Sequence, residues 1–248
     1  NYSKEIVFGE FHNKTKNYFS GPKSELPEES GGWCDYMVEL EFFKSMPEGI
    51  RKDAWFLTKV TMTGQERNPE TGRYPLLNWD DPATNQKHPY WKKNIESSDW
   101  VFNYDDGYYE TKGISSASGK TRMIFRYADI LLLYAEAVAY GTKSIDDLAF
   151  DCMWRVQERA GVPLISKDVT KEYFQKAVLD ERRWETAGME HSCMGRFFTM
   201  QRHEILHLQK NYRDAAELSL NPNLTLSEEF YYFPIPDNEL LIVPELKD

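Results

Sequence analysis

The sequence predicts a mainly α-helical protein in which paired helices stack into a superhelix, with long aromatic-rich loops and minor β-structure. Three observations support this fold class. Apolar residues recur at helical spacing after residue 120, residues 65–120 are irregular and rich in Trp and Tyr, and only short segments before them alternate as strands do. We expect one continuous domain with two parts, a loop-rich region over 1–120 and a paired-helix region over 121–248 that ends in a Pro-rich closing segment.

The segment Arg122–Tyr140 is the element around which the rest of the chain is organised. It is long enough for about five turns of helix. Its polar side chains fall in one narrow stripe, and nearly every other direction is apolar. Because such a helix is covered on most sides, we expect it to be an internal layer of a helical stack. Arg126 and Asp129 are three residues apart and can pair along the stripe, so that burial leaves neither charge alone.

Regular structure is sparse before this segment. Residues 1–33 start with a strand-like run and continue as loops that Gly and Pro interrupt. A helix is predicted over Tyr36–Ser45, where apolar residues recur at helical spacing. Alternating apolar and polar side chains, many of them β-branched, predict a strand over Ala54–Thr63. Long loops such as 65–120 are usually functional or disordered, and the many Trp and Tyr residues argue against disorder.

Three further helices are predicted in the second half. Ser144–Asp147 is a capping-box start for a helix that ends at Gly161. Thr170 can cap a second helix that runs to about Ala187. The third is expected over Gly195–Lys210.

Helix pairs of this length can be compared with the tetratricopeptide repeat. Placing Ala137 at the small-residue position of that repeat puts Tyr140 and Ala149 where the repeat has Tyr and Ala. The spacing therefore favours a tetratricopeptide-like α-superhelix that carries the loop-and-sheet part of the chain.

Composition excludes some partners. A net charge of -10 and the lack of a long basic run argue against nucleic acid or an anionic membrane, because both require a cationic face. No apolar run reaches membrane-spanning length, since charged residues interrupt even the richest one. Cys34, Cys152 and Cys193 are far apart and odd in number, so no disulfide framework is indicated, although one pair could form. No Gly-rich phosphate loop is present, and we expect no cofactor.

The run His203-Glu-Ile-Leu-His207 fits the H-E-x-x-H pattern of zinc peptidases. In that pattern two imidazoles one helical turn apart bind the metal and the Glu acts as general base. Glu228 or Glu229 lies at a separation that some such enzymes use for a third ligand. The alternative is a polar helix face with two partly exposed histidines. We favour it because nothing nearby supplies a substrate-binding edge strand or a carboxylate to orient the ligands.

Two other constellations have simpler structural interpretations. His191 and Cys193 could bind a metal or act as base and nucleophile, but a free Cys is more often a small buried apolar residue. The acidic pairs at 80–81 and 105–106 could hold Ca²⁺ or serve as glycosidase carboxylates, yet two acids in a turn are commonly just turn formers.

A charged cluster on the predicted helix before Ala187 is a further candidate. Arg182 and Arg183 stand beside Glu181 and Glu185 and could clamp a phosphate or a carboxylate. We favour an ion-pair network along the helix face, because residues three and four apart on a helix are neighbours.

The aromatic residues of the loops are the candidate ligand contacts. A pyranose ring offers a C–H face that stacks on an aromatic ring, and its hydroxyl groups require planar polar partners such as Asn, Gln and Asp. Most loop aromatics are expected to pin the loops to the body, with two or three facing a ligand. The predicted ligand-facing residues are Trp79, Trp91 and Tyr74, with Trp33 and Trp100 behind them.

Several motifs resemble those of one protein family, SusD/RagB. The run Phe125–Ala137, FRYADILLLYAEA, resembles its signature helix, and other motifs follow in the family's order. These are Pro47–Ala54, Arg159–Gly161, Glu181–Glu185, Gly195–Phe198, Phe233–Pro236 and Val243–Leu246. Trp154, Gln157 and Thr199 depart from the family's usual residues, which puts local packing in question more than membership.

The resemblance covers essentially the whole chain as the C-terminal half of the family. It implies a noncatalytic lipoprotein of the Bacteroidetes outer membrane that faces the cell surface, binds oligosaccharides or similar nutrients, and delivers them to a paired SusC-like TonB-dependent transporter. The superhelix would pack against that transporter while loops on another face hold the ligand. The N-terminal half and the lipid-bearing Cys are expected outside this chain, and the chain begins at Asn1 without an initiator Met.

The sequence leaves two alternative functions open. One is a zinc metallopeptidase that uses His203, Glu204 and His207. The other is a helical-repeat scaffold that binds only protein.

Overall fold

The computed structural model of the chain describes residues 4–13, 15, 19–20, 22–93, 95, 100–111, 117–188, 190–208, 213–220 and 234–247. The helices are α1 (Leu40–Ser45), α2 (Ile50–Trp55), α3 (Tyr127–Tyr140), α4 (Asp147–Ala160), α5 (Lys171–Thr186), α6 (Glu190–Arg202), α7 (Ala215–Leu220) and α8 (Asp237–Ile242). The strands are β1 (Ile6–Glu10), β2 (Phe19–Ser20), β3 (Phe56–Leu57), β4 (Lys59–Thr61), β5 (Leu76–Asn78), β6 (Tyr90–Trp91), β7 (Trp100–Phe102), β8 (Tyr109–Thr111), β9 (Ala117–Ser118) and β10 (Arg122–Arg126).

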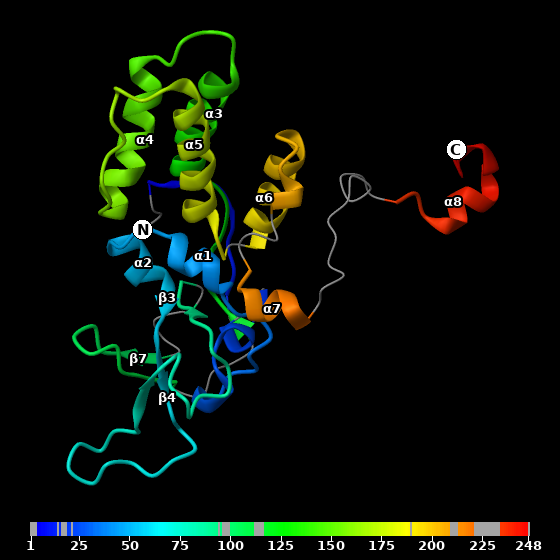
Figure 1. Cartoon of the computed structure of the whole chain (residues 1–248). Coiled ribbons are helices and arrows are strands. Elements are labelled where there is room, and N and C mark those ends of the chain that lie inside the picture. The colour runs from blue at the N-terminus through cyan, green and yellow to red at the C-terminus, as the bar shows by residue number, and fades with distance from the viewer. Residues whose placement is uncertain are drawn as a thin grey trace.

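The elements form a helical layer and a loop-and-strand part. Helices α3, α4 and α5 lie together at one end of the molecule, the short strands β3, β4 and β7 lie at the other end, and α1 and α2 lie between them (Figure 1). The mainly α fold class with minor β-structure is therefore confirmed. No helix in the part of the chain that the structure describes combines the length and the apolar character needed to cross a membrane.

The helical layer is built around one apolar core. Ala128, Leu132 and Ala135 of α3 face it, and the small side chains of the two alanines let α4 and α5 approach closely. The ring of Phe150 on α4 meets the ring of Phe174 on α5 nearly edge to face, with centroids 4.8 Å apart. The predicted pairing of helices is present in this layer.

The helix ends follow the sequence signals in part. Thr170 caps α5 by accepting the backbone N–H three residues ahead at 3.2 Å, as predicted. Helix α4 ends at Gly161 in the left-handed conformation (φ 69°), also as predicted. The predicted start of α4 is displaced, since Asp146 and not Ser144 supplies the capping side chain. Helix α6 overlaps the predicted range Gly195–Lys210, but it begins before Gly195 and ends at Arg202, before Lys210.

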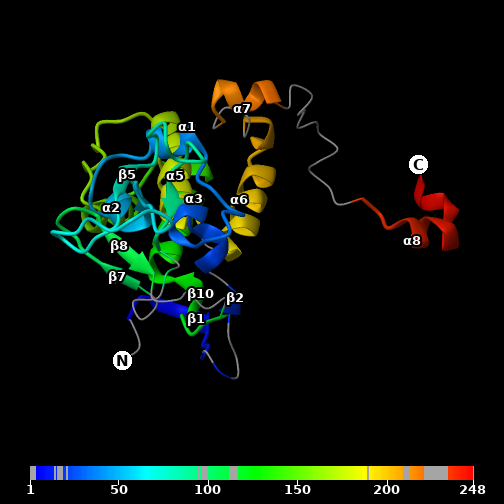
Figure 2. The same ribbon diagram turned by 90° about the horizontal axis from the view of Figure 1, so that it is seen from below.

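The prediction of one helix over Arg122–Tyr140 is wrong in its first part. Residues 122–126 form β10, which pairs antiparallel with β1, and α3 begins only at Tyr127. Figure 2 shows β1 and β10 side by side. The predicted pair of Arg126 and Asp129 is confirmed, because the Asp129 carboxylate accepts the Arg126 backbone N–H at 2.8 Å and lies 3.3 Å from its guanidinium. That contact caps α3 and so helps to end the strand.

The first half also differs in detail from its predictions. The helix predicted over Tyr36–Ser45 is shortened to α1. The strand predicted over Ala54–Thr63 is preceded by α2, whose last turn includes Ala54, and is divided into β3 and β4. Each of these strands pairs antiparallel with a distant segment, β3 with β6 and β4 with β5.

The loop-and-strand part has its own apolar core, which contains several of the loop aromatics. Tyr90 and Tyr109 are fully buried, and Trp100 is 9% exposed. The Tyr109 hydroxyl lies 2.8 Å from that of Ser30, which in turn donates to the backbone oxygen of Thr61. As expected, most of these aromatic side chains pin the loops to the body of the protein.

The helical and loop parts meet where backbones approach very closely. A Cβ atom at Gly49 would lie 2.7 Å from the backbone oxygen of Ala160 and 2.8 Å from that of Gly161. Gly161 in turn faces Ile50, with 3.2 Å between a built Cβ and the Ile50 backbone nitrogen. Only glycine fits at this crossing of the α2 N-terminus and the α4 C-terminus.

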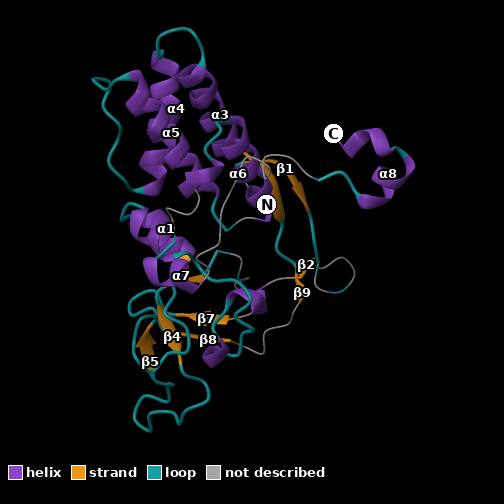
Figure 3. Ribbon diagram, turned by 45° about the vertical axis from the view of Figure 1, so that its right-hand side comes forward, coloured by secondary structure: helices purple, strands orange, loops and turns teal. Residues whose placement is uncertain are grey.

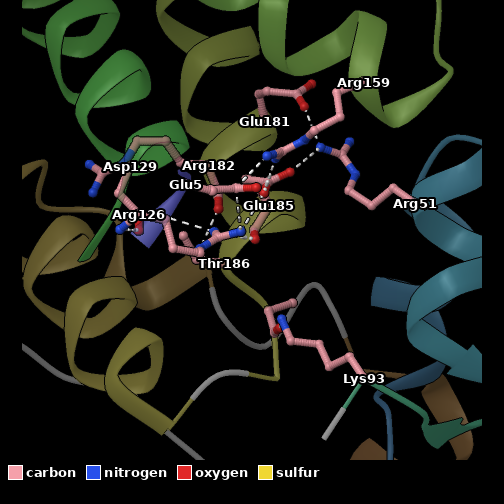
Figure 4. A network of polar contacts seen from close by, with 11 residues as sticks. Glu5, Arg51, Lys93, Arg126, Asp129, Arg159, Glu181, Arg182, Glu185 and Thr186 are labelled. Atoms are coloured by element: carbon pink, nitrogen blue, oxygen red, sulfur yellow. Dashed lines mark hydrogen bonds and ion pairs between the residues drawn. The ribbon is translucent and has the colours of Figure 1, made fainter. Parts of the chain in front are cut away.

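A buried network of arginines and carboxylates ties the same two parts together (Figure 4). Arg51 on α2 donates to Glu181 at 2.5 Å and to Glu185 at 3.1 Å, both on α5. Glu185 also accepts from Arg126 at 2.7 Å and from Arg159 on α4 at 2.5 Å. The prediction that Glu181 and Glu185 pair with arginines along the α5 face is therefore wrong, because their partners in this network come from elements far apart in sequence.

The two carboxylates of this network differ in pKa. Burial raises the pKa of Glu185, but Arg126, Arg159 and Arg51 outweigh that effect and hold it below the ordinary value. Burial dominates at Glu181, where Arg51 opposes it, and the pKa is raised. Glu185 is therefore the charged centre of the joint.

Candidate functional site

The candidate site is a pocket of about 440 Å³ between the α1–α2 region and the β7–β8 hairpin. A cavity of this size lies within the range of small-ligand sites in proteins. It is lined by aromatic rings and by charged groups of both signs. The members used below are Phe43, Lys52, Phe56, Lys92, Phe102 and Tyr104.

The inner wall of the pocket is aromatic. The rings of Phe43 and Phe56 meet edge to face with centroids 5.3 Å apart. The Trp79 ring packs against Phe43 with centroids 6.0 Å apart, and the Trp91 ring packs against Phe56 with centroids 5.2 Å apart. Both tryptophans are half-buried. These two predicted residues therefore adjoin the pocket and buttress the rings that line it. Gly188 leaves room for Trp91, because a built Cβ there would lie 2.4 Å from the indole ring.

The outer wall comes from the β7–β8 hairpin. Phe102 and Tyr104 contact each other edge to face at 4.7 Å, and Tyr104 is 82% exposed. The Lys92 ammonium lies 4.1 Å from the Phe102 ring centre and donates to the backbone oxygen of Asp53 at 2.9 Å. Partial burial lowers the pKa of Lys92 from its ordinary value. Trp100 packs against Phe102 on the side of the core, with the two ring centroids 4.9 Å apart.

The polar groups of the pocket balance in charge. Its lining includes the three cations Lys52, Lys59 and Lys92 and the three acids Glu48, Asp53 and Asp106. Lys52 pairs with Glu48 at 2.6 Å, and its ammonium lies 4.4 Å from the Phe43 ring centre. Fixed donors and acceptors beside aromatic rings, without excess charge, suit a neutral polyhydroxylated ligand.

None of the five predicted aromatics lines this pocket, although Trp79, Trp91 and Trp100 contact rings that do. The Arg67 guanidinium lies over the Tyr74 ring, 3.9 Å from the ring centre. The Tyr74 backbone N–H donates to the Tyr108 hydroxyl. Trp33 is 51% exposed, with the Lys23 ammonium 5.5 Å from its ring. Trp100 is part of the core, as described above. Contact of any of the five predicted aromatics with a ligand stays a prediction.

None of the lining residues was among the five predicted aromatics, and four of them illustrate why. Phe102 and Tyr104 belong to the aromatic-rich loops, so the signal that selected their neighbours also applies to them. Lys92 adjoins the predicted Trp91, and Phe43 belonged to a predicted helix face. Nothing local distinguishes these four, because they meet only when α1, β6 and β7 are brought together.

The zinc-peptidase motif lacks the required geometry. Helix α6 ends at Arg202, and Glu204 adopts a left-handed conformation (φ 55°), so His203 and His207 do not share a helix face. The His203 imidazole lies 2.7 Å from the Glu136 carboxylate, which also accepts from Arg202 at 2.5 Å. Within the described ranges no group of three His, Cys, Asp or Glu side chains could hold a metal ion. Glu228 and Glu229 lie outside those ranges.

The other constellations have structural roles or fall outside the description. Asp81 accepts the Ala83 backbone N–H at 2.8 Å within its turn, and Asp106 pairs with Arg73 at 2.6 Å. Asp106 also accepts the Tyr108 backbone N–H at 3.0 Å, so one carboxylate of each acidic pair stabilises its turn, as favoured from the sequence. The side chains of His191 and Cys193 lie outside the described residues. Cys34 and Cys152 are free thiols.

Comparison with known proteins places this fold. A search of curated proteins found no match. Among solved structures, a SusD superfamily protein from Parabacteroides distasonis is 18% identical, with a TM-score of 0.66 over 97% of this chain and 48% of that one. A second, from Bacteroides vulgatus, is 19% identical, with a TM-score of 0.61 over 97% of this chain and 49% of that one.

A further similar structure contains a sugar. Surface glycan-binding protein A from Bacteroides thetaiotaomicron, in complex with laminarihexaose, is 19% identical, with a TM-score of 0.57 over 96% of this chain and 50% of that one. The chain thus spans about half the length of these solved relatives. The sequence model of the SusD family matches residues 4–248, so this chain belongs to the SusD family.

Proposed function

We propose that this protein binds a neutral oligosaccharide, without catalysing a reaction, in the pocket between α1–α2 and the β7–β8 hairpin. The observation that carries the proposal is the combination of exposed and half-buried rings with paired charges in one pocket of about 440 Å³. The exposed Tyr104 ring offers a stacking face for a sugar, and the half-buried Phe102 ring next to it widens that surface. The laminarihexaose complex of a relative with the same fold supports this ligand class.

Specific contacts can be assigned to the pocket. Lys59 lines the pocket and donates to the Asn78 side chain at 2.6 Å, so its ammonium is held in place as a cationic donor. The Lys92 ammonium beside the Phe102 ring can donate to a ring hydroxyl while the sugar stacks on Tyr104. Trp79 and Trp91 hold the inner rings in place and would report ligand binding through their fluorescence.

Membership of the family supports a proposal for the cellular role. We propose that the complete protein is a lipoprotein at the outer face of the outer membrane, and that it passes bound glycan to a SusC-like TonB-dependent transporter. The helical layer would contact that transporter, since the pocket lies on the loop-and-strand part of the molecule.

Titration with sugars tests the proposal. Isothermal calorimetry and Trp fluorescence would be measured with neutral β-glucan, α-glucan and mannan oligosaccharides, with a uronic-acid oligomer as the charged comparison. Tyr104→Ala is expected to weaken binding about tenfold, because an aromatic contact contributes about 0.5–1.5 kcal/mol beyond the area that it buries. Tyr173→Ala removes another exposed Tyr, on α5 away from the pocket, and should leave affinity unchanged. Equal loss in both variants, or no response to any sugar, would refute the pocket assignment.

A further inference from the structure

The charged side chains that line the candidate pocket are nearly all engaged within the chain. Lys52 pairs with Glu48 at 2.6 Å, and Asp106 pairs with Arg73 at 2.6 Å. Lys59 donates to a neighbouring amide side chain, as described above. These groups are held by protein partners, so their charges are already balanced before a ligand enters. They shape the pocket more than they select what it binds.

The carboxylate of Asp53 is the exception. It lines the pocket from α2, its residue is exposed, and it makes no hydrogen bond or ion pair with any residue that the structure describes. Lys92 lies next to it, since its ammonium donates to the Asp53 backbone oxygen at 2.9 Å. Burial lowers the pKa of Lys92, and the charge of Asp53 opposes that effect, so the two groups act on each other. The pocket therefore presents an unused acceptor beside a cationic donor.

This donor and acceptor adjoin the aromatic wall. The Lys92 ammonium lies 4.1 Å from the Phe102 ring centre and 5.3 Å from the Tyr104 ring centre. Figure 3 shows the strands of the β7–β8 hairpin next to β4, in the part of the molecule below α1. A pyranose stacks on an aromatic ring through its C–H face and directs its hydroxyl groups outward from the ring edge. A sugar on Tyr104 thus brings its hydroxyl edge toward Lys92 and Asp53.

On the basis of the function proposed above, we propose that Asp53 and Lys92 select glycans whose sugar units keep two free hydroxyls on adjacent ring carbons. One hydroxyl donates to the Asp53 carboxylate, and its neighbour accepts from the Lys92 ammonium. Both hydrogen bonds involve a charged group, which makes them stronger than bonds between neutral groups. The substrate class is a neutral glycan with such a pair on its internal units.

The linkage of a glycan decides whether its internal units have this pair. In a hexopyranose chain joined through the fourth or the sixth carbon, each internal unit keeps its hydroxyls on the second and third carbons. In a chain joined through the third carbon, the linkage consumes one of them, and the remaining hydroxyls are not on adjacent ring carbons. Asp53 and Lys92 therefore favour the first kind of linkage over the second.

Calorimetric titration with hexasaccharides tests the inference. Cellohexaose, maltohexaose and mannohexaose are joined through the fourth carbon and differ in shape, so a preference tied to Asp53 reports the hydroxyl pair and not one chain shape. Laminarihexaose is joined through the third carbon and offers adjacent hydroxyls only on its terminal units. The tightest of the first three should bind the unmodified protein about tenfold more tightly than laminarihexaose does, because a hydrogen bond to a charged group is worth about that factor or more.

Variants assign this preference to one side chain. Asp53→Ala should weaken binding of the preferred hexasaccharide about tenfold and change the affinity for laminarihexaose by less than about threefold. Asp53 is exposed, so the substitution creates no cavity in a core. The matched control is Asp151→Ala, which removes an exposed carboxylate from α4, outside the pocket lining. It should leave all four affinities unchanged.

Two results would overturn the inference while the proposed function stands. One is binding of laminarihexaose as tightly as the other three, and the second is an Asp53→Ala variant that weakens all four equally or none. In both cases Tyr104→Ala would still weaken every sugar that binds, because stacking on that ring does not depend on linkage. Failure of the unmodified protein to bind any of the four would instead refute the proposed function, and the selection by Asp53 with it.

Discussion

Glu185 is the residue whose loss should most weaken the joint between the helical layer and the loop part. The variant Glu185→Gln keeps the shape of the side chain and removes its charge. In the folded protein this carboxylate is only 2% exposed and lies within 3.1 Å of Arg51, Arg126 and Arg159. The substitution removes the one anion that these three arginines share. Arg51 keeps Glu181, Arg126 keeps Asp129 and Arg159 keeps Glu5, but the buried positive charge loses its central partner, which is costly.

The expected magnitude follows from that geometry. Removing one partner of a buried ion pair costs about 3–5 kcal/mol of the free energy of unfolding. Glu181→Gln should cost less, because Arg51 keeps Glu185 as a partner and the raised pKa of Glu181 shows that its charged form is held less favourably. The control is Glu41→Gln on α1. Its carboxylate is 40% exposed and pairs with the exposed Lys44, so the expected loss is below about 1 kcal/mol.

Urea denaturation followed by circular dichroism measures these differences. The midpoint should fall most for Glu185→Gln, less for Glu181→Gln and least for Glu41→Gln, with similar slopes for all. Slopes that agree show that each variant exposes the same surface on unfolding. A loss below about 1 kcal/mol for Glu185→Gln would refute the reasoning, since it would place this network among surface ion pairs.

Three further predictions concern pH, backbone packing and the core. The pKa of Glu185 is lowered in the folded state, so its stabilising contribution is present above the ordinary Glu pKa of 4.5 and is lost as pH falls through the folded value. The Glu185→Gln variant lacks this titration. The pH dependence of its urea midpoint below pH 4.5 should therefore be flatter than that of the unmodified protein. Gly49→Ala should destabilise by about 2 kcal/mol or more in thermal unfolding, because its Cβ would meet backbone oxygens at 2.7 and 2.8 Å, whereas Gly64→Ala, with open space around it, should stay within about 0.5 kcal/mol. Trp100→Ala should lower the free energy of unfolding by about 3–5 kcal/mol, because this side chain is buried. Tyr104 is exposed, so Tyr104→Ala should leave the free energy of unfolding nearly unchanged. A large loss of stability in Tyr104→Ala would contradict the assignment of Tyr104 as a ligand contact.

The family motifs acquire a physical meaning once their positions in the structure are known. Arg51, Arg159 and Glu185 come from three motifs that are far apart in sequence, and they meet in one buried network. Gly49 and Gly161 come from two of the same motifs and cross at the adjacent backbone contact. These residue types are required by the junction between the two parts of the fold. The candidate pocket takes Glu48, Lys52 and Asp53 from the first of these motifs, whereas its aromatic rings come from segments that the motifs do not include.

Local sequence signals determined the class of the protein and many helix ends. The caps at Thr170 and Gly161 and the pair Arg126–Asp129 depend on residues within a few positions of each other, so they can be recognised without a tertiary structure. The aromatic-rich composition of 65–120 likewise predicted an ordered loop region. Order of motifs along the chain was sufficient to identify the family.

Tertiary structure decided which of these residues face a ligand, a core or another segment. Residues 122–126 became a strand because β1 supplies a pairing partner more than a hundred positions away, and the H-E-x-x-H run lost its helix beyond Arg202. Trp100 and Tyr104 have similar sequence surroundings, yet one is buried and the other is 82% exposed. Burial depends on contacts between distant segments, and a sequence window records only the neighbours along the chain.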